Sequence, residues 1–187
     1  MGRCSLCGET SPFISKELSV CLDCIRSRPD DALEIAQGIH AHSRAAFGLP
    51  ISPPKAPGGI ACNLCVNECI IPEGGSGYCG LRKNEGGKLI GASAEQGKLS
   101  WYHDPLPTNC VADWVCTCGA GAGFPAFTHC TGPELGYKNL AVFFHACTFN
   151  CLFCQNWQFK QEGLSRRYIS PEDLASSVDE RTSCICY

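Results

Sequence analysis

The chain has 187 residues, a formal charge of −3 and 17 cysteines. This length allows one ordinary domain or two small ones. The nearly balanced charge does not favour nucleic-acid or anionic-membrane binding, and no apolar run approaches membrane-spanning length. No export signal opens the chain, and most of the cysteines stand in close pairs. They therefore indicate metal binding in a reduced, cytoplasmic protein rather than disulfide formation.

Residues 1–28 carry two Cys-x2-Cys pairs, Cys4 with Cys7 and Cys21 with Cys24. Each pair can direct two thiolates at one ion, which is the pattern of a zinc ribbon. A redox-active pair is the alternative, but neither pair is followed by a βαβ pattern. We therefore predict a structural zinc site on these four thiols.

A helix is predicted for residues 29–49, followed by a stiff Pro/Gly linker over residues 50–59. Asp30 and Asp31 can cap the start of this helix. Gly48-Leu49-Pro50 is expected to end it. The predicted apolar face has helical spacing and consists of Ala32, Ile35, Ala36 and Ile39.

A second four-cysteine module is predicted in residues 60–91, with Cys62-x2-Cys65-x3-Cys69 followed by Cys79. Glycines around the last cysteine suit a backbone that folds tightly around a metal. Four thiolates fit either zinc or an auxiliary 4Fe–4S cluster, and the spacing does not choose between them.

Residues 92–138 are rich in Gly and Pro without a clean period, and we predict loop and short strands there. Cys184 and Cys186 are interpreted as core thiols of a later strand. Four further cysteines follow no recognised metal-binding spacing and are interpreted as buried thiols, with a metal site as the alternative: Cys110, Cys116, Cys118 and Cys130.

The last part of the chain, residues 139–187, predicts a βαβ unit. Residues 139–144 form a continuous apolar run, typical of a strand buried in a parallel sheet. Ser170-Pro171-Glu172-Asp173 is a capping box that starts a helix, and residues 183–187 resume an apolar strand. The predicted fold class is α/β: the first βαβ of a partial (β/α) barrel, truncated, preceded by small cysteine-rich modules.

Directly after the first of these strands comes Cys147-x3-Cys151-x2-Cys154, with Phe153 before the last thiol. Three thiolates on one loop can hold three corners of a 4Fe–4S cube and leave one iron open to a small molecule. The alternatives are that these are buried thiols without a metal, or that they are three of the four ligands of a zinc site.

This loop resembles the signature of the radical S-adenosylmethionine (radical SAM) superfamily. Gln155-Asn156-Trp157 narrows the likeness to proteins similar to pyruvate formate-lyase activating enzymes. Residues 62–91 also resemble the CxxCxxxC…GxCGLR module that precedes the core in a group of such proteins. The resemblance implies that S-adenosylmethionine binds the open iron and that Phe153 lies beside its adenine.

The resemblance implies a parent enzyme that reduces S-adenosylmethionine and abstracts a hydrogen atom from a substrate, with flavodoxin or ferredoxin as reductant. Glycyl-radical activation of a partner protein is the nearest activity, but here the cysteine modules precede the core. A small-molecule or peptide substrate is therefore equally open. The chain is expected to be an inactive N-terminal portion. Other hypotheses are a non-catalytic metal-binding module and ferredoxin-like electron transfer.

Overall fold

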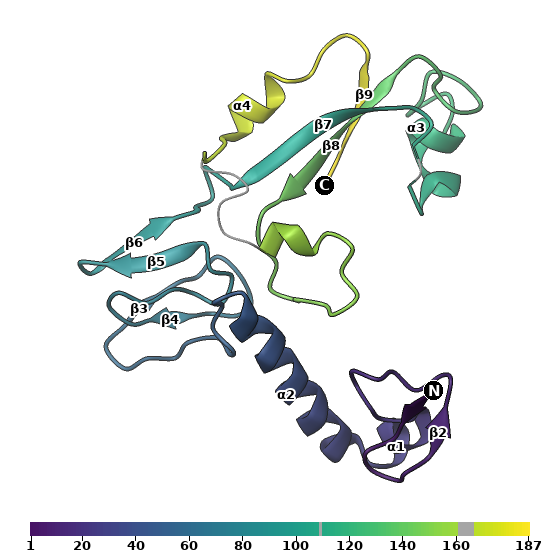
Figure 1. Ribbon diagram of the computed structural model, residues 1–187. Coiled ribbons are helices and arrows are strands. Elements are labelled where there is room, and N and C mark those ends of the chain that lie inside the picture. The colour runs from purple at the N-terminus through teal and green to yellow at the C-terminus, as the bar shows by residue number, and fades with distance from the viewer. Residues whose placement is uncertain (109, 161–166) are drawn as a thin grey trace. The chain divides into compact units, whose positions relative to one another are not determined.

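The computed structural model describes residues 1–108, 110–160 and 167–187, and it combines one long helix and several short ones with small sheets (Figure 1). The chain divides into two compact units. The first unit contains Met1–Gly91 and Cys147–Lys160, and the second contains Ala92–Ala146 and Gln161–Tyr187. None of the helices in the described residues has the length and apolar character that crossing a membrane requires.

The first unit begins with a small cysteine-rich fold. Strands β1 (Gly2–Arg3) and β2 (Thr10–Ser11) pair antiparallel, and helix α1 (Leu22–Ser27) follows them. The apolar core here is small, and half of its fully buried members are cysteines: Cys4, Ile14, Val20, Cys21, Cys24 and Ala32. With so little hydrocarbon buried, a unit of this size ordinarily needs a metal or a disulfide for stability.

Helix α2 (Pro29–Ala46) confirms the predicted long helix, but its start differs from the prediction. The N-cap residue is Arg28, which makes no side-chain capping hydrogen bond, and Pro29 occupies the first turn. Asp30 and Asp31 therefore lie inside the first turn, where carboxylates interact favourably with the positive end of the helix dipole. Asp31 also pairs with Arg28 at 2.8 Å.

The four-cysteine module consists of two hairpins, β3 (Ile60–Ala61) with β4 (Ile70–Ile71) and β5 (Arg82–Glu85) with β6 (Lys88–Gly91). Both residues of the second turn, Gly86 and Gly87, have positive φ, as a tight hairpin turn requires. The Pro/Gly segment before β3 also pairs with β4: Ile70 N donates to Pro54 O at 2.7 Å, and Ala56 N donates to Ile70 O at 3.0 Å. This segment therefore packs on the module that it precedes.

The second unit is built on a three-stranded sheet in the order β7 (Leu99–Pro105), β8 (Lys138–Phe144), β9 (Thr182–Cys186). β9 runs parallel to β8, as the predicted βαβ unit requires. α4 (Pro171–Ala175) lies between these strands in sequence, and its capping box joins Ser170 and Asp173 reciprocally at 3.1 and 3.3 Å. The buried core of this sheet and helix consists of Leu99, Leu140, Val142, Ile169 and Leu174.

Strand β7 is longer than the sequence predicts, since residues 92–138 are expected to form loop and short strands. Its sequence contains His103, Asp104 and a terminal Pro105, which are poor strand signals. β7 pairs antiparallel with β8 along its whole length and lies at the sheet edge, where proline is tolerated. The described residues therefore form a mixed three-stranded sheet and show no radical SAM barrel.

The remaining described helices are short. In the second unit, η1 (Asp113–Val115) is a 3₁₀ helix that leads into α3 (Thr117–Ala120), and Cys116 is the N-cap of α3. In the first unit, η2 (Trp157–Lys160) follows the three-cysteine loop. Both regions lack a long apolar period, so their helices depend on tertiary contacts rather than on propensity.

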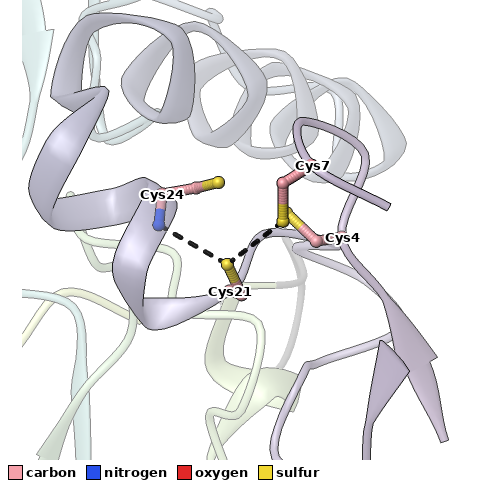
Figure 2. A group of neighbouring side chains, drawn as sticks. All are labelled: Cys4, Cys7, Cys21 and Cys24. Carbon is pink, nitrogen blue, oxygen red and sulfur yellow. Dashed lines mark hydrogen bonds between the residues drawn. The ribbon is translucent and has the colours of Figure 1, made fainter. Parts of the chain in front are cut away.

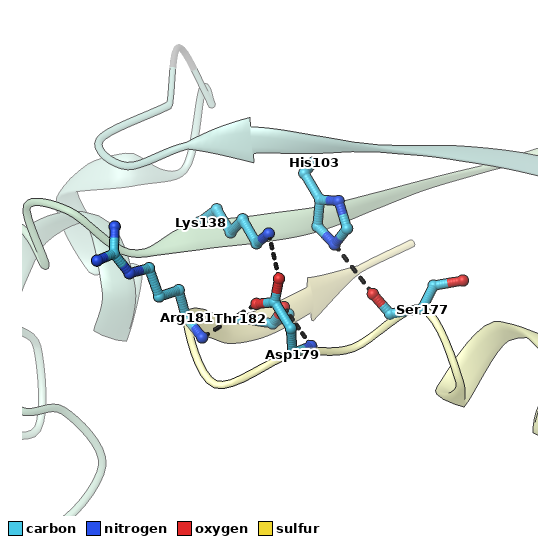
Figure 3. A network of polar contacts seen from close by, with 6 residues as sticks. All are labelled: His103, Lys138, Ser177, Asp179, Arg181 and Thr182. Atoms are coloured by element: carbon cyan, nitrogen blue, oxygen red, sulfur yellow. Dashed lines mark hydrogen bonds and ion pairs between the residues drawn. The ribbon is translucent and has the colours of Figure 1, made fainter.

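A polar network holds the turn before β9 (Figure 3). Lys138 Nζ donates to Asp179 Oδ2 at 2.6 Å, and Arg181 N and Thr182 Oγ1 donate to Asp179 Oδ1 at 3.0 and 3.1 Å. His103 Nε2 donates to the Ser177 carbonyl at 3.0 Å from the neighbouring strand β7. The carboxylate of Asp179 thus fixes the register at which β9 joins the sheet.

Asp179 should titrate far below an ordinary aspartate. The hydrogen bond from Lys138, with further donors, lowers the pKa of Asp179 from 3.8 to about 2. A lowered folded-state pKa stabilises the fold above pH 3.8, and this stabilisation is lost as the pH falls toward 2. The stability difference between wild type and Asp179→Asn should therefore shrink over this range. Carboxyl NMR titration checks the pKa, and a midpoint near 3.8 would contradict the network.

Candidate metal and cluster sites

The N-terminal cysteines form one converging site (Figure 2). The sulfurs of Cys4, Cys7, Cys21 and Cys24 all lie within 4.8 Å of one another. Cys7 Sγ lies 3.6 Å from Cys21 Sγ. Tetrahedral zinc with Zn–S bonds of about 2.3 Å places its sulfurs about 3.8 Å apart. The quartet can therefore hold one metal ion with little rearrangement.

Local structure explains the convergence of the quartet. Cys4 and Cys7 lie in the turn after β1, where Gly8 N donates to Cys4 O and closes the loop. Cys21 is the N-cap of α1, and its sulfur accepts from Cys24 N at 3.4 Å. The helix start thus directs the second pair of thiols at the first pair.

The electrostatics of the quartet favour a bound cation. Burial raises the pKa of Cys4, but backbone hydrogen bonds from Cys21, Cys7 and Leu6 outweigh it and lower this pKa to about 6. Burial and the neighbouring thiols raise the pKa of Cys24 well above its usual value. The four thiols therefore do not all ionise on their own, whereas a divalent cation deprotonates thiols that coordinate it. This donor set fits zinc.

The thiols of the four-cysteine module are differently arranged. Cys62 and Cys69 are buried, Cys79 is half-buried and Cys65 is exposed. Each of the last three accepts a nitrogen donor: Tyr78 N at 3.4 Å on Cys69, Leu81 N at 3.4 Å on Cys79, and Asn67 Nδ2 at 3.5 Å on Cys65. Such donors stabilise thiolates in zinc and iron–sulfur sites alike. Among the described residues, only the N-terminal quartet gathers its sulfurs within 4.8 Å.

The three-cysteine loop is fastened to helix α2 at its middle. Asn150 is fully buried with φ 52°, and its Nδ2 donates to Ser43 Oγ at 3.1 Å. His40 Nε2 donates to the Phe149 carbonyl at 2.5 Å. Asparagine tolerates this left-handed conformation better than most residues, so Asn150 can reverse the chain between Cys147 and Cys151.

The second half of the loop is a tight turn. Cys154 N donates to Cys151 O at 3.2 Å, and Lys160 Nζ from η2 donates to the same carbonyl at 3.1 Å. Cys147 is exposed, while Cys151 and Cys154 are half-buried. Thiolates on separate irons of a cube lie farther apart than ligands of a single ion. Among the described residues, these three sulfurs are not gathered within 4.8 Å of one another as those of the N-terminal quartet are.

Exposed aromatic side chains surround the same loop. Phe153 is 90% exposed and Phe149 is 76% exposed, and Trp157 is also exposed. Gln155 and Asn156 are exposed between them. An exposed ring beside three thiols offers an apolar face to a planar group such as a nucleobase.

Arg44 on α2 is a functional candidate that sequence reasoning missed. Its side chain is fully buried, its Nε donates to Pro50 O at 2.6 Å, and its Nη2 donates to the Tyr78 carbonyl. The guanidinium also lies 3.5 Å from the centre of the Tyr78 ring. Burial lowers the pKa of Arg44, whereas Tyr78, Cys79 and Cys147 oppose that shift. The buried guanidinium thus interacts electrostatically with one thiol of the four-cysteine module, Cys79, and with one thiol of the three-cysteine loop, Cys147. The sequence shows only that Arg44 lies outside the predicted apolar face of α2, and this does not predict its burial.

Comparison with known proteins gives a relative of uncharacterized function and assigns no protein family. No family model and no solved structure matches this chain. It is 30% identical over 129 residues to an uncharacterized protein of Methanocaldococcus jannaschii, MJ0808. The match covers 67% of this chain and 32% of that protein, so the chain spans about a third of the length of that relative.

Proposed function

We propose that this chain carries the cluster-binding segment of a radical SAM enzyme, with a 4Fe–4S cluster on Cys147, Cys151 and Cys154. The observation that carries the proposal is a CxxxCxxC loop whose turn is fixed by the buried side chain of Asn150. Three thiolates on a rigid backbone leave one iron without a protein ligand. That open position is what the amino and carboxylate groups of S-adenosylmethionine require.

Different residues of the loop and of α2 would bind the cluster, contact the cofactor and position the backbone. The three thiolates hold the cluster, and Phe153 offers its exposed ring to the adenine. Ser43 and His40 hold the backbone through Asn150 and Phe149, so that the thiolates keep their spacing. A reduced cluster held by these three thiolates would supply the electron for reductive cleavage of S-adenosylmethionine.

The further proposals concern the whole protein. We propose a zinc ion on the N-terminal quartet, and zinc or an auxiliary 4Fe–4S cluster on Cys62, Cys65, Cys69 and Cys79. The reductant is a flavodoxin or ferredoxin, and the protein is cytoplasmic. The substrate is either a partner protein that receives a glycyl radical or a small molecule or peptide.

A second candidate function is non-catalytic. Of the predicted cysteine sites in the described residues, only the N-terminal quartet is gathered for a single ion. That observation favours a metal-binding module whose zinc ribbon contacts a partner. The two functions differ in one measurable property, which is iron bound to the three-cysteine loop.

The iron–sulfur proposal predicts a cluster that depends on three cysteines. The chain, reconstituted anaerobically with iron and sulfide, should lose about four iron atoms on replacement of Cys147, Cys151 and Cys154 by alanine. The matched control is Cys130→Ala, since Cys130 Sγ contacts the Gly132 carbonyl at 3.1 Å and belongs to no proposed site. Metal analysis checks the loss, and an iron content equal to that of wild type would refute the cluster.

Binding of S-adenosylmethionine should change the electron paramagnetic resonance spectrum of the reduced cluster, because the cofactor occupies the open iron. In the whole protein, dithionite reduction should release 5′-deoxyadenosine and methionine, and Cys154→Ala should abolish both. A whole protein with an intact cluster but no cleavage would favour electron transfer instead.

A further inference from the structure

One cysteine of the N-terminal quartet differs from the other three in its access to solvent. Cys7 is exposed, whereas Cys4 is 1% exposed and Cys21 and Cys24 are each 5% exposed. A surface hollow of about 520 Å³ is lined by Arg3, Cys4, Ser5, Cys7 and Gly8. Oxidation of cysteines follows exposure as well as thiolate character. A small oxidant in solution therefore reaches Cys7 more readily than the buried members of the quartet.

The exposed thiol lies next to a buried thiol of the other Cys-x2-Cys pair (Figure 2). Cys7 Sγ is 3.6 Å from Cys21 Sγ, although the two residues are 14 positions apart. A disulfide requires a sulfur–sulfur distance of about 2.05 Å. The contact joins the two pairs instead of lying within one of them, so the spacing in the sequence does not predict it.

Hydrogen bonds of the backbone bring together the two segments that carry these thiols. Ser5 N donates to Ser19 O at 2.7 Å, which joins the turn after β1 to the segment before α1. Arg28 Nη1, from the end of α1, donates to Leu6 O at 3.1 Å. A disulfide between Cys7 and Cys21 would therefore link segments that are already adjacent in the fold.

We propose that Cys7 is an oxidation site of this protein and that Cys21 is its resolving thiol, so that hydrogen peroxide converts the N-terminal zinc site into a Cys7–Cys21 disulfide and releases the ion. This inference rests on the zinc ion proposed for the quartet. Zinc has no redox chemistry of its own, so the two thiolates supply both electrons.

The reaction proceeds in two displacement steps. The Cys7 thiolate attacks one oxygen of hydrogen peroxide, so that an S–O bond forms, the O–O bond breaks and hydroxide leaves. The Cys21 thiolate then attacks the Cys7 sulfur, so that the S–S bond forms, the S–O bond breaks and a second hydroxide leaves. Two thiolates are oxidised by two electrons in total, and one peroxide is reduced to two hydroxide ions.

The disulfide changes the cross-link that stabilises the unit. Cys4 and Cys24 remain as thiols, and two thiolates are half of the ligand set that structural zinc ordinarily takes. A unit with so small an apolar core can be stabilised by a disulfide as well as by a metal. A dithiol reductant attacks the disulfide and regenerates both thiols, after which zinc binds again. The site thus works as a reversible redox switch.

The test uses the full chain, loaded with zinc under reducing conditions and then freed of reductant. Hydrogen peroxide should release zinc, and mass spectrometry of the alkylated protein should find a Cys7–Cys21 disulfide. Cys7→His keeps a zinc ligand but removes the exposed thiol, so it should retain about one zinc per chain that wild type releases. The matched control, Cys130→Ser, should release zinc as wild type does. Dithiothreitol with added zinc should restore the zinc content of the wild type.

The possible failures separate this inference from the zinc site on which it rests. Equal zinc content in reduced wild type and reduced Cys24→Ser would overturn both. Zinc that remains bound in peroxide, or equal release from wild type and Cys7→His, would overturn the oxidation site alone. Disulfide mapping in the wild type decides the pairing even if Cys7→His fails to bind zinc, and a Cys4–Cys7 disulfide would overturn the role of Cys21. Sulfinic acid on Cys7 that dithiothreitol does not reverse would overturn the switch.

Discussion

Replacement of Cys24 by serine should release the N-terminal metal ion and unfold residues 1–28. The physical reason is the composition of this core. Its buried members are three cysteines with Ile14, Val20 and Ala32, and the apolar residues packed against them are only partly buried: Leu6, Leu18 and Ile35. So small an apolar cluster does not stabilise a unit of this size without a bound metal or a disulfide. Binding of the ion and folding of the unit are therefore coupled.

Zinc analysis and amide hydrogen exchange measure this effect. Cys24→Ser should lose about one zinc per chain and the exchange protection of residues 1–28, and chelation of the wild type should do the same. Phe13→Ala is the matched control, because Phe13 lies in the same region and is 96% exposed. Full exchange protection after the ion has been removed would show that the apolar core is sufficient by itself.

Replacement of Arg44 by alanine should destabilise the first unit by about 3 kcal/mol. Two carbonyl oxygens, of Pro50 and Tyr78, lose their donor, and each loss costs ~1–3 kcal/mol in a buried setting. The stacking of the guanidinium on the Tyr78 ring is lost as well. Arg44→Lys should restore little, since an ammonium cannot reproduce the planar fork that contacts both oxygens.

Urea unfolding and the reduction potential of a bound cluster measure the effect of Arg44. The midpoint should fall for Arg44→Ala and stay unchanged for His42→Ala, an exposed position on the same helix. Because Arg44 interacts electrostatically with Cys79 and Cys147, its loss should also lower the reduction potential of any cluster on those thiols. An unchanged midpoint in Arg44→Ala would show that the contacts of this arginine contribute no net stability.

The sequence by itself determined the features that are local along the chain. Each Cys-x2-Cys pair presents two thiols from one turn, so the N-terminal quartet follows from spacing, and the structure gathers it. The apolar run of β8 and the capping box at Ser170 likewise predict a strand and a helix start from neighbouring residues. These signals persist because backbone geometry relates residues two to four apart in a constant way.

Tertiary structure decided the features that join distant residues. β7 exists as a long strand because β8 offers it an edge, although its own sequence is a poor strand signal. Arg44 is buried because the chain near Pro50 and Tyr78 returns to α2 and supplies carbonyls. Cys118 and Ser183 are 65 residues apart, and packing of α3 against β9 brings the Ser183 hydroxyl to 3.5 Å from the Cys118 sulfur. No spacing in the chain encodes that contact, since pairing register and packing depend on all the strands at once.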